Sequence, residues 1–235
     1  MRNMKAVFIK QMLSFFKNPA MLGTPIAFLL IPLAILLLVP GAYEDIDVIT
    51  AQFVVMFVGI SMIGTSSGLI MEDRVTMNLR FMGMAGVKPY QYMVSICAAL
   101  IIISMLALVL FALIGGHSGD ALIIFLTVSM LGAMCSMLFG ITLSLSKLGP
   151  FAPLFGMLLG IGPMFSEANE FLAGVFHFVY THHVNIIIRE GTTDYLNESL
   201  QIIFINMIVV IAAFVVLNSR YGLDGEKMTR KEIGA

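Results

Sequence analysis

The sequence predicts an all-α membrane protein with six transmembrane helices, an N-terminal interfacial helix and a re-entrant external segment between spans five and six. Three observations lead to this prediction. Hydrophobic residues make up 59% of the chain and charged residues 11%, and the mean hydropathy is +0.99, far from the composition of soluble proteins. Apolar stretches long enough to cross a bilayer recur along the chain. The loops that join them carry their charges very unevenly.

Six apolar stretches are predicted to span the membrane. They are Met21–Val39, Phe53–Met71, Met93–Ile114, Leu122–Leu145, Phe151–Phe165 and Ile202–Leu217. The first span contains Pro25 and Pro32, which a bilayer helix tolerates only where neighbouring helices or local distortion satisfy the freed carbonyl groups. We therefore expect a kinked first helix that faces other parts of the protein.

The cationic residues fall almost entirely on one side of this topology, with only Arg189 on the other. By the positive-inside rule that side is cytoplasmic, with both termini on it. We expect a multi-pass protein of a bacterial cell membrane. No basic cluster is large enough to neutralise several phosphates, which argues against nucleic-acid binding. The cationic residues on the cytoplasmic side are Arg2, Lys5, Lys10, Lys17, Arg74, Arg80, Lys88, Lys147, Arg220, Lys227, Arg230 and Lys231.

We expect one transmembrane domain over residues 1–235, with four segments outside the spans. Residues 72–91 form a cytoplasmic loop, residues 164–199 the external re-entrant segment and residues 219–235 a cytoplasmic tail. Residues 1–18 form the interfacial helix, which would place its aromatic side chains in the acyl boundary. Its polar face contains Asn3, Lys10, Ser14 and Lys17, mostly opposite Met4, Phe8, Met12, Phe15 and Phe16. The external segment is apolar at helical spacing but too short to span, so we expect its backbone to be buried in protein or to line a cavity.

The spans as bounded above contain no Asp, Glu, Lys or Arg. Ion-coupled carriers usually bind the driving ion with ionisable groups or broken helices near the midplane, so this absence argues against proton or sodium coupling. The chain also lacks the Gly-x-x-x-x-Gly-Lys-Ser/Thr phosphate loop; the nearest segment, Gly83–Lys88, has the wrong spacing. We expect neither enzymatic activity nor a cofactor on this chain, so any energy must come from a partner.

The cytoplasmic loop is where that energy could enter. Thr76 can cap a short helix that ends at Gly86, and Pro89 can begin the next helix. The short helix would carry Leu79, Phe81, Met82 and Met84. A soluble loop does not normally display so many apolar groups, so we expect a docking partner. The alternative is a helix that lies on the membrane surface.

The order of residues in this loop also carries a resemblance. The loop begins with Glu72 and Arg74, continues through Thr76 and Asn78-Leu79-Arg80, and reaches Ala85-Gly86-Val87 before Pro89 and Tyr92. This segment resembles the coupling-helix region of type-2 ATP-binding-cassette (ABC-2) exporter permeases. The segment Tyr180–Arg189 resembles the part of that family that leads to an external Arg. Val75 stands where many members carry Gly, and His182-His183 stands where Pro is common.

The resemblance implies a half-transporter that moves an amphipathic or hydrophobic substrate, such as a drug, lipid or peptide, outward. Two copies, or two related permeases, would pair along the first and fifth spans, and each would bind one cytoplasmic ATPase subunit that holds ATP and Mg²⁺. Gly156 and Gly160 are candidates for the dimer interface, because small residues let helices approach closely in lipid; packing within one chain is the alternative. The implied ATPase-coupling residues are Glu72, Arg74, Thr76, Asn78, Leu79, Arg80, Phe81 and Met82.

Other functions fit the sequence less well. An energy-independent channel or an assembly or immunity protein is the main alternative. The segment Gly64–Gly68 matches the Gly-x-Ser-x-Gly elbow of serine hydrolases, but that elbow requires a strand-turn-helix context and this segment lies in an apolar helix. His177, His182 and His183 lack the i, i+4 spacing that places two imidazoles on one helical face. We therefore expect neither a hydrolase nor a metal site.

Overall fold

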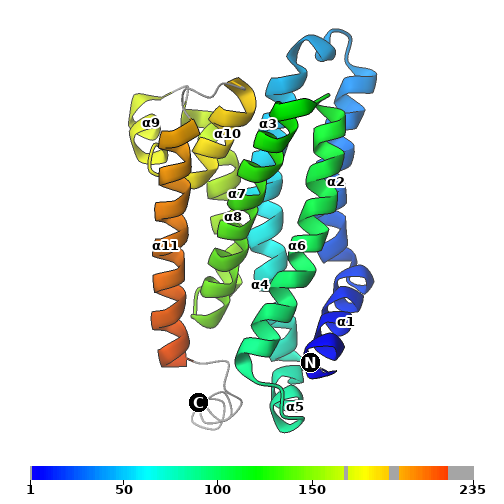
Figure 1. Ribbon diagram of the computed structural model, residues 1–235, viewed down its shortest axis with the longest axis vertical. Helices are drawn as coiled ribbons and strands as arrows, with labels where there is room; N and C mark the ends of the chain where they lie inside the picture. Colours follow the sequence, from blue (N-terminus) through cyan, green and yellow to red (C-terminus); the bar gives the residue numbers. More distant parts are fainter. Residues whose placement is uncertain (1, 167–168, 191–195, 222–235) are drawn as a thin grey trace.

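A computed structural model describes residues 2–166, 169–190 and 196–221 of the chain (Figure 1). Nearly all of these residues are helical, and no strand occurs among them, which confirms the all-α prediction. The predicted cytoplasmic tail is described only as far as Tyr221, so Lys227, Arg230 and Lys231 lie outside the described residues. Residues 167–168 and 191–195 of the predicted external segment also lie outside them.

The described residues contain five helices long and apolar enough to cross a membrane. They are α2 (Pro19–Leu38), the continuous run Ala42–Val75, α6 (Pro89–Ile114), α7 (Gly119–Leu145) and α11 (Leu196–Tyr221). The helices α9 (Glu170–Phe176) and α10 (Tyr180–Glu190) are bent by 104° and would make a sixth span if the pair were counted as one. The chain is therefore compatible with a multi-pass membrane protein.

The predicted fifth span is shorter than its neighbours. The helices η3 (Gly149–Phe151) and α8 (Ala152–Phe165) together cover Gly149–Phe165. At 1.5 Å per residue this stretch is about 25 Å long, which is less than the roughly 30 Å hydrocarbon core of a bilayer. The chain leaves α8 before reaching the length of a full span, and α9 and α10 then continue at that end of the bundle.

The predicted second span is longer than expected and is interrupted by a π-helix. It consists of η1 (Ala42–Asp45), α3 (Ile46–Met56), the π-helical η2 (Phe57–Ser61) and α4 (Met62–Val75). The prediction ended at Met71, whereas α4 continues to Val75 and includes three charged residues in its last turn. The π-helix is not visible in the hydropathy pattern because every residue within it is compatible with a regular helix.

Glycine residues allow the π-helix to pack closely against α8. A Cβ atom on Gly59 of η2 would lie 2.6 Å from the Cα and N atoms of Gly160 in α8, and a Cβ atom on Gly160 would lie 2.8 Å from Cγ1 of Ile60. Gly156 faces the same turn and is also buried. The structure thus places Gly156 and Gly160 in contacts within one chain, and these buried positions are not exposed for a contact between copies.

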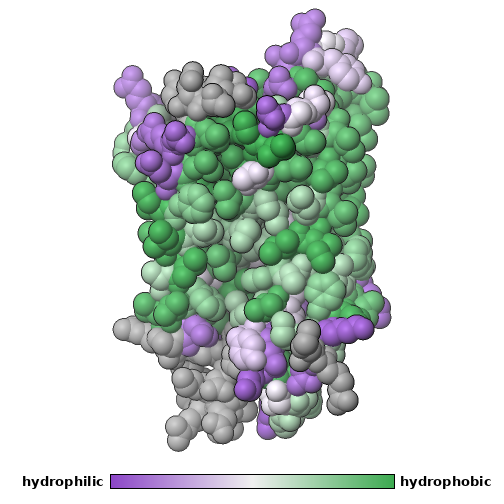
Figure 2. Space-filling view, viewed as in Figure 1, coloured by the Kyte–Doolittle hydropathy of each residue, from purple (hydrophilic) through white to green (hydrophobic). Residues whose placement is uncertain are grey.

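The long helices lie side by side in one bundle (Figure 1). At one end lie α1 (Arg2–Lys17), α5 (Asn78–Met84) and the last turn of α11, and at the other end lie α9 and α10. Figure 2 shows a broad hydrophobic band between two ends where hydrophilic groups gather. Of the five long apolar helices, α2 and α11 have the smallest share of buried residues. Pro25 and Pro32 nevertheless face inward and are buried, as expected for the first helix.

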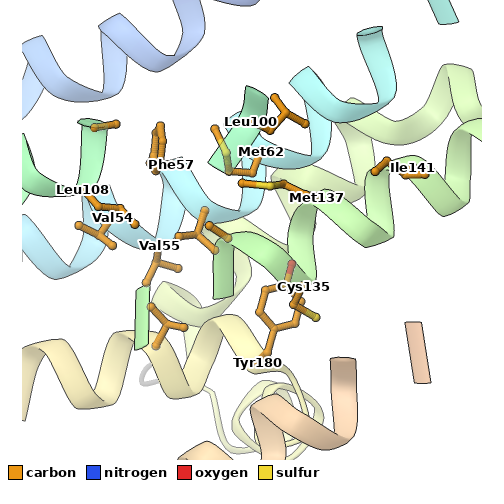
Figure 3. Packing of buried hydrophobic residues seen from close by; sticks show 14 of the residues in the cluster. Val54, Val55, Phe57, Met62, Leu100, Leu108, Cys135, Met137, Ile141 and Tyr180 are labelled. Atoms are coloured by element: carbon orange, nitrogen blue, oxygen red, sulfur yellow. The ribbon is translucent and has the colours of Figure 1, made fainter. Parts of the chain in front are cut away.

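The hydrophobic core lies between α3, α4, α6, α7 and α10 (Figure 3). Phe57 of η2 and Phe111 of α6 pack with ring centroids 5.6 Å apart. The external segment reaches this core, because the buried Tyr180 of α10 hydrogen-bonds to Ser136 of α7 at 2.6 Å. The external segment was expected to be buried in protein or to line a cavity, because backbone groups at membrane depth cannot be left exposed to lipid. Along α10 this segment is covered by protein.

The N-terminal helix α1 packs on α6 with a face that differs from the predicted one. The residues Val7, Gln11 and Phe15, spaced four apart, are buried. Phe15 was expected in the acyl boundary of the membrane, and the structure contradicts this placement. The prediction failed because α1 carries apolar residues on both faces, while its buried face includes the polar Gln11. The exposed apolar residues of α1 are Ile9, Leu13 and Phe16.

Candidate functional site

The loop between α4 and α6 begins differently from the prediction. Thr76 belongs to the end of α4, where its hydroxyl donates a hydrogen bond to the Glu72 carbonyl at 2.7 Å. Met77 occupies the N-cap position of α5 with a φ of 55° and no side-chain cap, a conformation uncommon for a residue other than glycine. The predicted cap by Thr76 is wrong because the preceding turn already uses its hydroxyl.

The turn at Gly86 and the start of α6 agree with the prediction, although α5 itself ends at Met84, two residues before Gly86. Gly86 has a φ of +75°, and the Val87 N–H donates to the Met82 carbonyl at 3.0 Å, which satisfies a carbonyl at the end of α5. Pro89 is the first residue of α6. The Lys88 N–H donates to the Gln91 side chain at 3.0 Å, so α5 is a short helix closed by a tight turn.

Asp73 is fully buried in the last turn of α4 and joins four helices. Its Oδ1 atom pairs with the Lys10 ammonium of α1 and accepts a hydrogen bond from Asn78 Nδ2 of α5 at 3.3 Å. Its Oδ2 atom accepts from Gln11 Nε2 of α1 at 2.8 Å and from the Tyr92 hydroxyl of α6 at 2.9 Å. We call these five residues the Asp73 cluster.

The Asp73 cluster fixes α5 relative to the bundle. Burial of a carboxylate is costly unless it is paired and hydrogen-bonded, and a carboxylate can accept about four hydrogen bonds. The donors from α1, α5 and α6 fill that capacity. Removal of any one helix from this arrangement would leave the buried charge with fewer donors, so the four helices are expected to keep their relative positions.

The two charged residues beside Asp73 contact two further helices. Glu72 Oε2 lies 3.5 Å from Asn18 Nδ2, at the start of α2. The Arg74 guanidinium donates to the Ser144 carbonyl near the end of α7. The last turn of α4 is therefore linked by side chains to α1, α2, α5, α6 and α7 at one end of the bundle.

The predicted coupling residues separate into two groups. Glu72, Arg74, Thr76 and Asn78 are bonded within the chain, as described above. Leu79 is only 7% exposed and Met82 packs partly against the core, so these two residues do not form the exposed contact surface that was expected. Arg80 and Phe81 are exposed, and Phe81 has an exposed fraction of 60%.

Helical spacing accounts for this division. Met84 follows Arg80 by four residues and Phe81 by three, which places these three on one face of α5; Met77 is the N-cap residue just before the helix. All four are exposed, Met84 by 67%. We call them the exposed α5 surface. Leu79 lies off this stripe, and its side chain is buried instead.

Sequence analysis missed the residues that hold the loop in place. Gln11 and Asn18 were not connected with the loop, Tyr92 was named only as part of the resemblance, and Lys10 was assigned only to a polar helix face and to the cytoplasmic side. The available signal was weak: Gln11 is a polar residue on the same face as Val7 and Phe15, at the spacing of a buried stripe. The pairing itself could not be seen, because Gln11 and Asp73 are 62 positions apart.

His177, His182 and His183, at the opposite end of the bundle, take part in hydrogen bonds. His183 Nδ1 lies 3.0 Å from Ser199 Oγ, and His183 Nε2 lies 2.7 Å from the His177 carbonyl oxygen. His182 Nδ1 lies 3.4 Å from Ser166 Oγ. In the parts of the chain that the structure describes, no group of three or more His, Cys, Asp or Glu residues could hold a metal ion.

The segment Gly64–Gly68 lies inside α4 and has no strand before it. Ser66 is fully buried, and its hydroxyl donates to the Ile63 carbonyl at 3.2 Å. This is the local bond of a serine in a helix, whereas a nucleophile elbow exposes its serine at a strand-to-helix turn. The segment therefore lacks the geometry of a hydrolase site.

No protein-family model, curated protein or solved structure matches the chain. The functional interpretation therefore depends on the geometry of the exposed α5 surface and of the Asp73 cluster.

Proposed function

We propose that this chain is the membrane subunit of an ATP-driven exporter of the ABC-2 type, which moves an amphipathic or hydrophobic substrate outward and is powered by a separate ATPase subunit. The exposed α5 surface is the observation that supports this proposal. It presents Phe81 and Met84 with Arg80 on one helical face, and Met77 just before the helix is also exposed. Aromatic, Met and Arg side chains are enriched where proteins bind one another.

The Asp73 cluster supports a role in transmitting a movement of α5 to the long helices of the bundle. A partner that displaces α5 would move Asn78, which is bonded to Asp73 of α4. The same carboxylate is bonded to α1 and α6. Because α5 is a seven-residue helix between two tight turns, its displacement would pass to the ends of these helices and would not be absorbed by a flexible loop.

In this proposal α8 is the fifth span, α9 and α10 form the external re-entrant pair, and both termini are cytoplasmic. A second copy would contact exposed apolar side chains of α2 and α8, such as Leu37, Leu154 and Leu158. Gly156 and Gly160 would support that interface indirectly, since they hold α8 against η2. The apolar interior of the spans favours an amphipathic or hydrophobic substrate over an ion or a sugar.

Affinity purification from membranes of the native host tests the proposal. We expect the tagged chain to retain an ATP-binding subunit, and the double variant F81A/M84A to retain at least tenfold less. Truncation of a side chain at an interface hot spot costs about 2 kcal/mol, and 1.4 kcal/mol corresponds to a tenfold change in affinity. Both side chains are exposed, so the fold should be unaffected.

Phe178→Ala is the matched control, because Phe178 is 72% exposed and lies beside α10 at the opposite end of the bundle. This variant should retain the ATP-binding subunit fully. A wild-type chain that retains no ATPase would instead favour an energy-independent membrane protein. Full retention by F81A/M84A would remove the exposed α5 surface from the proposal.

A further inference from the structure

The helix α1 and the start of α2 border a groove of about 710 Å³ on the outside of the bundle. Its apolar wall includes Ile9 and Leu13, with exposed fractions of 46% and 51%. Its polar lining includes Lys17, Asn18 and Glu72. The groove thus combines an apolar wall with one exposed ammonium group and one carboxylate.

The two charges are available to a ligand. Lys10 also borders the groove, but Asp73 already neutralises it. Among the residues that the structure describes, neither Lys17 nor Glu72 forms an ion pair. The Glu72 carboxylate accepts a long hydrogen bond of 3.5 Å from Asn18 Nδ2, and a carboxylate can accept about four hydrogen bonds, so it can still accept others from a cation.

The position of the groove indicates the kind of molecule that fills it. Pro19 is the first residue of α2, which is apolar enough to cross a membrane, and α1 lies at the edge of the bundle beside it (Figure 1). The groove therefore lies where the hydrophobic band meets the polar end. In a bilayer this level is occupied by phospholipid head groups and the first methylene groups of their acyl chains.

We infer that this groove binds the head group of a phosphatidylethanolamine-type phospholipid. The Lys17 ammonium would donate to the lipid phosphate, and the lipid's primary ammonium would donate to the Glu72 carboxylate. Ile9 and Leu13 would contact the first acyl methylene groups. One cation and one anion in the same groove complement a zwitterion, as opposite charges do across an interface.

Other head groups match the groove less well. The head group of phosphatidylglycerol is anionic, so it would satisfy Lys17 but bring no cation to Glu72. The quaternary ammonium of phosphatidylcholine has no N–H to donate to a carboxylate. Charge-assisted hydrogen bonds are roughly twice as strong as neutral ones, so the missing contact should produce a measurable preference.

Native mass spectrometry of the purified, delipidated chain tests this inference. The three lipids, with identical acyl chains, are added at equal concentrations. We expect phosphatidylethanolamine to be retained about tenfold more than phosphatidylcholine or phosphatidylglycerol, as one charge-assisted hydrogen bond would give. No ATPase is needed, so the result does not depend on the proposed transport function.

Matched variants locate the site. E72Q should abolish the preference over phosphatidylglycerol, and K17Q should lower retention of all three lipids, whereas K17R should restore it. K147Q is the control, since Lys147 is exposed in the loop after α7 and does not line the groove. Melting curves show whether each variant is folded, and K17R keeps the test valid if K17Q is not.

Equal retention of the three lipids by the wild-type chain would overturn the inference. So would a phosphatidylethanolamine preference that persists in both K17Q and E72Q, because the lipid would then bind elsewhere. A preference for phosphatidylglycerol that is lost in K17Q would show a site for anionic lipids and would also overturn it.

Discussion

Asp73 shows how one side chain can determine the arrangement of several helices. It is fully buried, yet it is bonded to Lys10, Gln11, Asn78 and Tyr92. A buried carboxylate destabilises the fold when its partners are absent. When they are present, it favours the one arrangement of helices that brings them together. The contribution of Asp73 is therefore best measured by removing it.

We expect Asp73→Ala to lower the free energy of unfolding by about 3 kcal/mol, because the substitution leaves Lys10 without its counter-charge and three donors without an acceptor. Unfolding in detergent by heat or denaturant gives this value. Glu44→Gln, at an exposed site at the opposite end of the bundle, should stay within about 0.5 kcal/mol of the wild type. Equal stability of Asp73→Ala and the wild type would mean that the cluster does not hold the helices together.

His117 predicts a pH dependence of stability. Burial lowers the pKa of His117, and the Asp47 carboxylate opposes this shift. Since the folded-state pKa lies below the unfolded value of about 6.5, the stabilisation by neutral His117 is complete above about pH 6.5 and is lost as the pH falls toward the folded-state pKa. The melting temperature should therefore fall on acidification from pH 7. This decrease should be smaller in His117→Gln, and an identical decrease in that variant would refute the assignment.

At the scale of elements, hydropathy predicts the middle of each span better than its ends. The predicted spans and the observed helices have similar centres except in the second span, where the continuous run begins at Ala42, eleven residues before Phe53. In addition, α4 extends four residues beyond the predicted end at Met71, and α6 begins four residues before Met93. Polar residues continue a helix when other helices supply partners for them, and a single sequence does not reveal those partners. The π-helix at Phe57–Ser61 was also missed, and its close contact with α8 is likewise not visible in a single sequence.

The contact between η2 and α8 predicts unequal effects for two glycine substitutions. Gly59→Ala would place Cβ 2.6 Å from the backbone of Gly160, which cannot rotate away, so we expect a loss of about 1–3 kcal/mol of stability. Gly64→Ala meets nothing within 4 Å, and its stability should be unchanged or up to about 1 kcal/mol higher because alanine favours a helix. Thermal unfolding of both variants tests this order. The reverse order would show that α8 moves freely against η2.

At the scale of the whole molecule, the charge distribution and the structure agree on which segments share an end. The sequence placed Lys10, Arg74 and Arg80 on one side of the membrane, and the structure brings α1, the end of α4 and α5 together at one end of the bundle. The turn at Gly86 after α5 and the start of α6 at Pro89 could also be predicted, because glycine and proline act locally. The Asp73 cluster could not, because its members come from distant segments.

The positive-inside rule predicts the orientation of this end. In a chain with Cys97 and Cys135 replaced by alanine, a cysteine at Arg80 should react with an impermeant maleimide only after the cells are opened. A cysteine at Ser118, an exposed residue at the opposite end, should react in intact cells. Labelling of the Arg80 position in intact cells would place α5 outside, where a cytoplasmic ATPase could not bind it.

The π-helix at Phe57–Ser61 also determines where the long helix Ala42–Val75 can lose a residue by deletion. A turn of this kind contains one residue more than a regular turn. Deletion of one residue within this turn would convert it to a regular turn, and α3 and α4 would keep the same faces toward the bundle. A deletion elsewhere in the same helix would rotate one half by about 100° relative to the other. We therefore expect a one-residue deletion in this helix to be tolerated best at Phe57–Ser61.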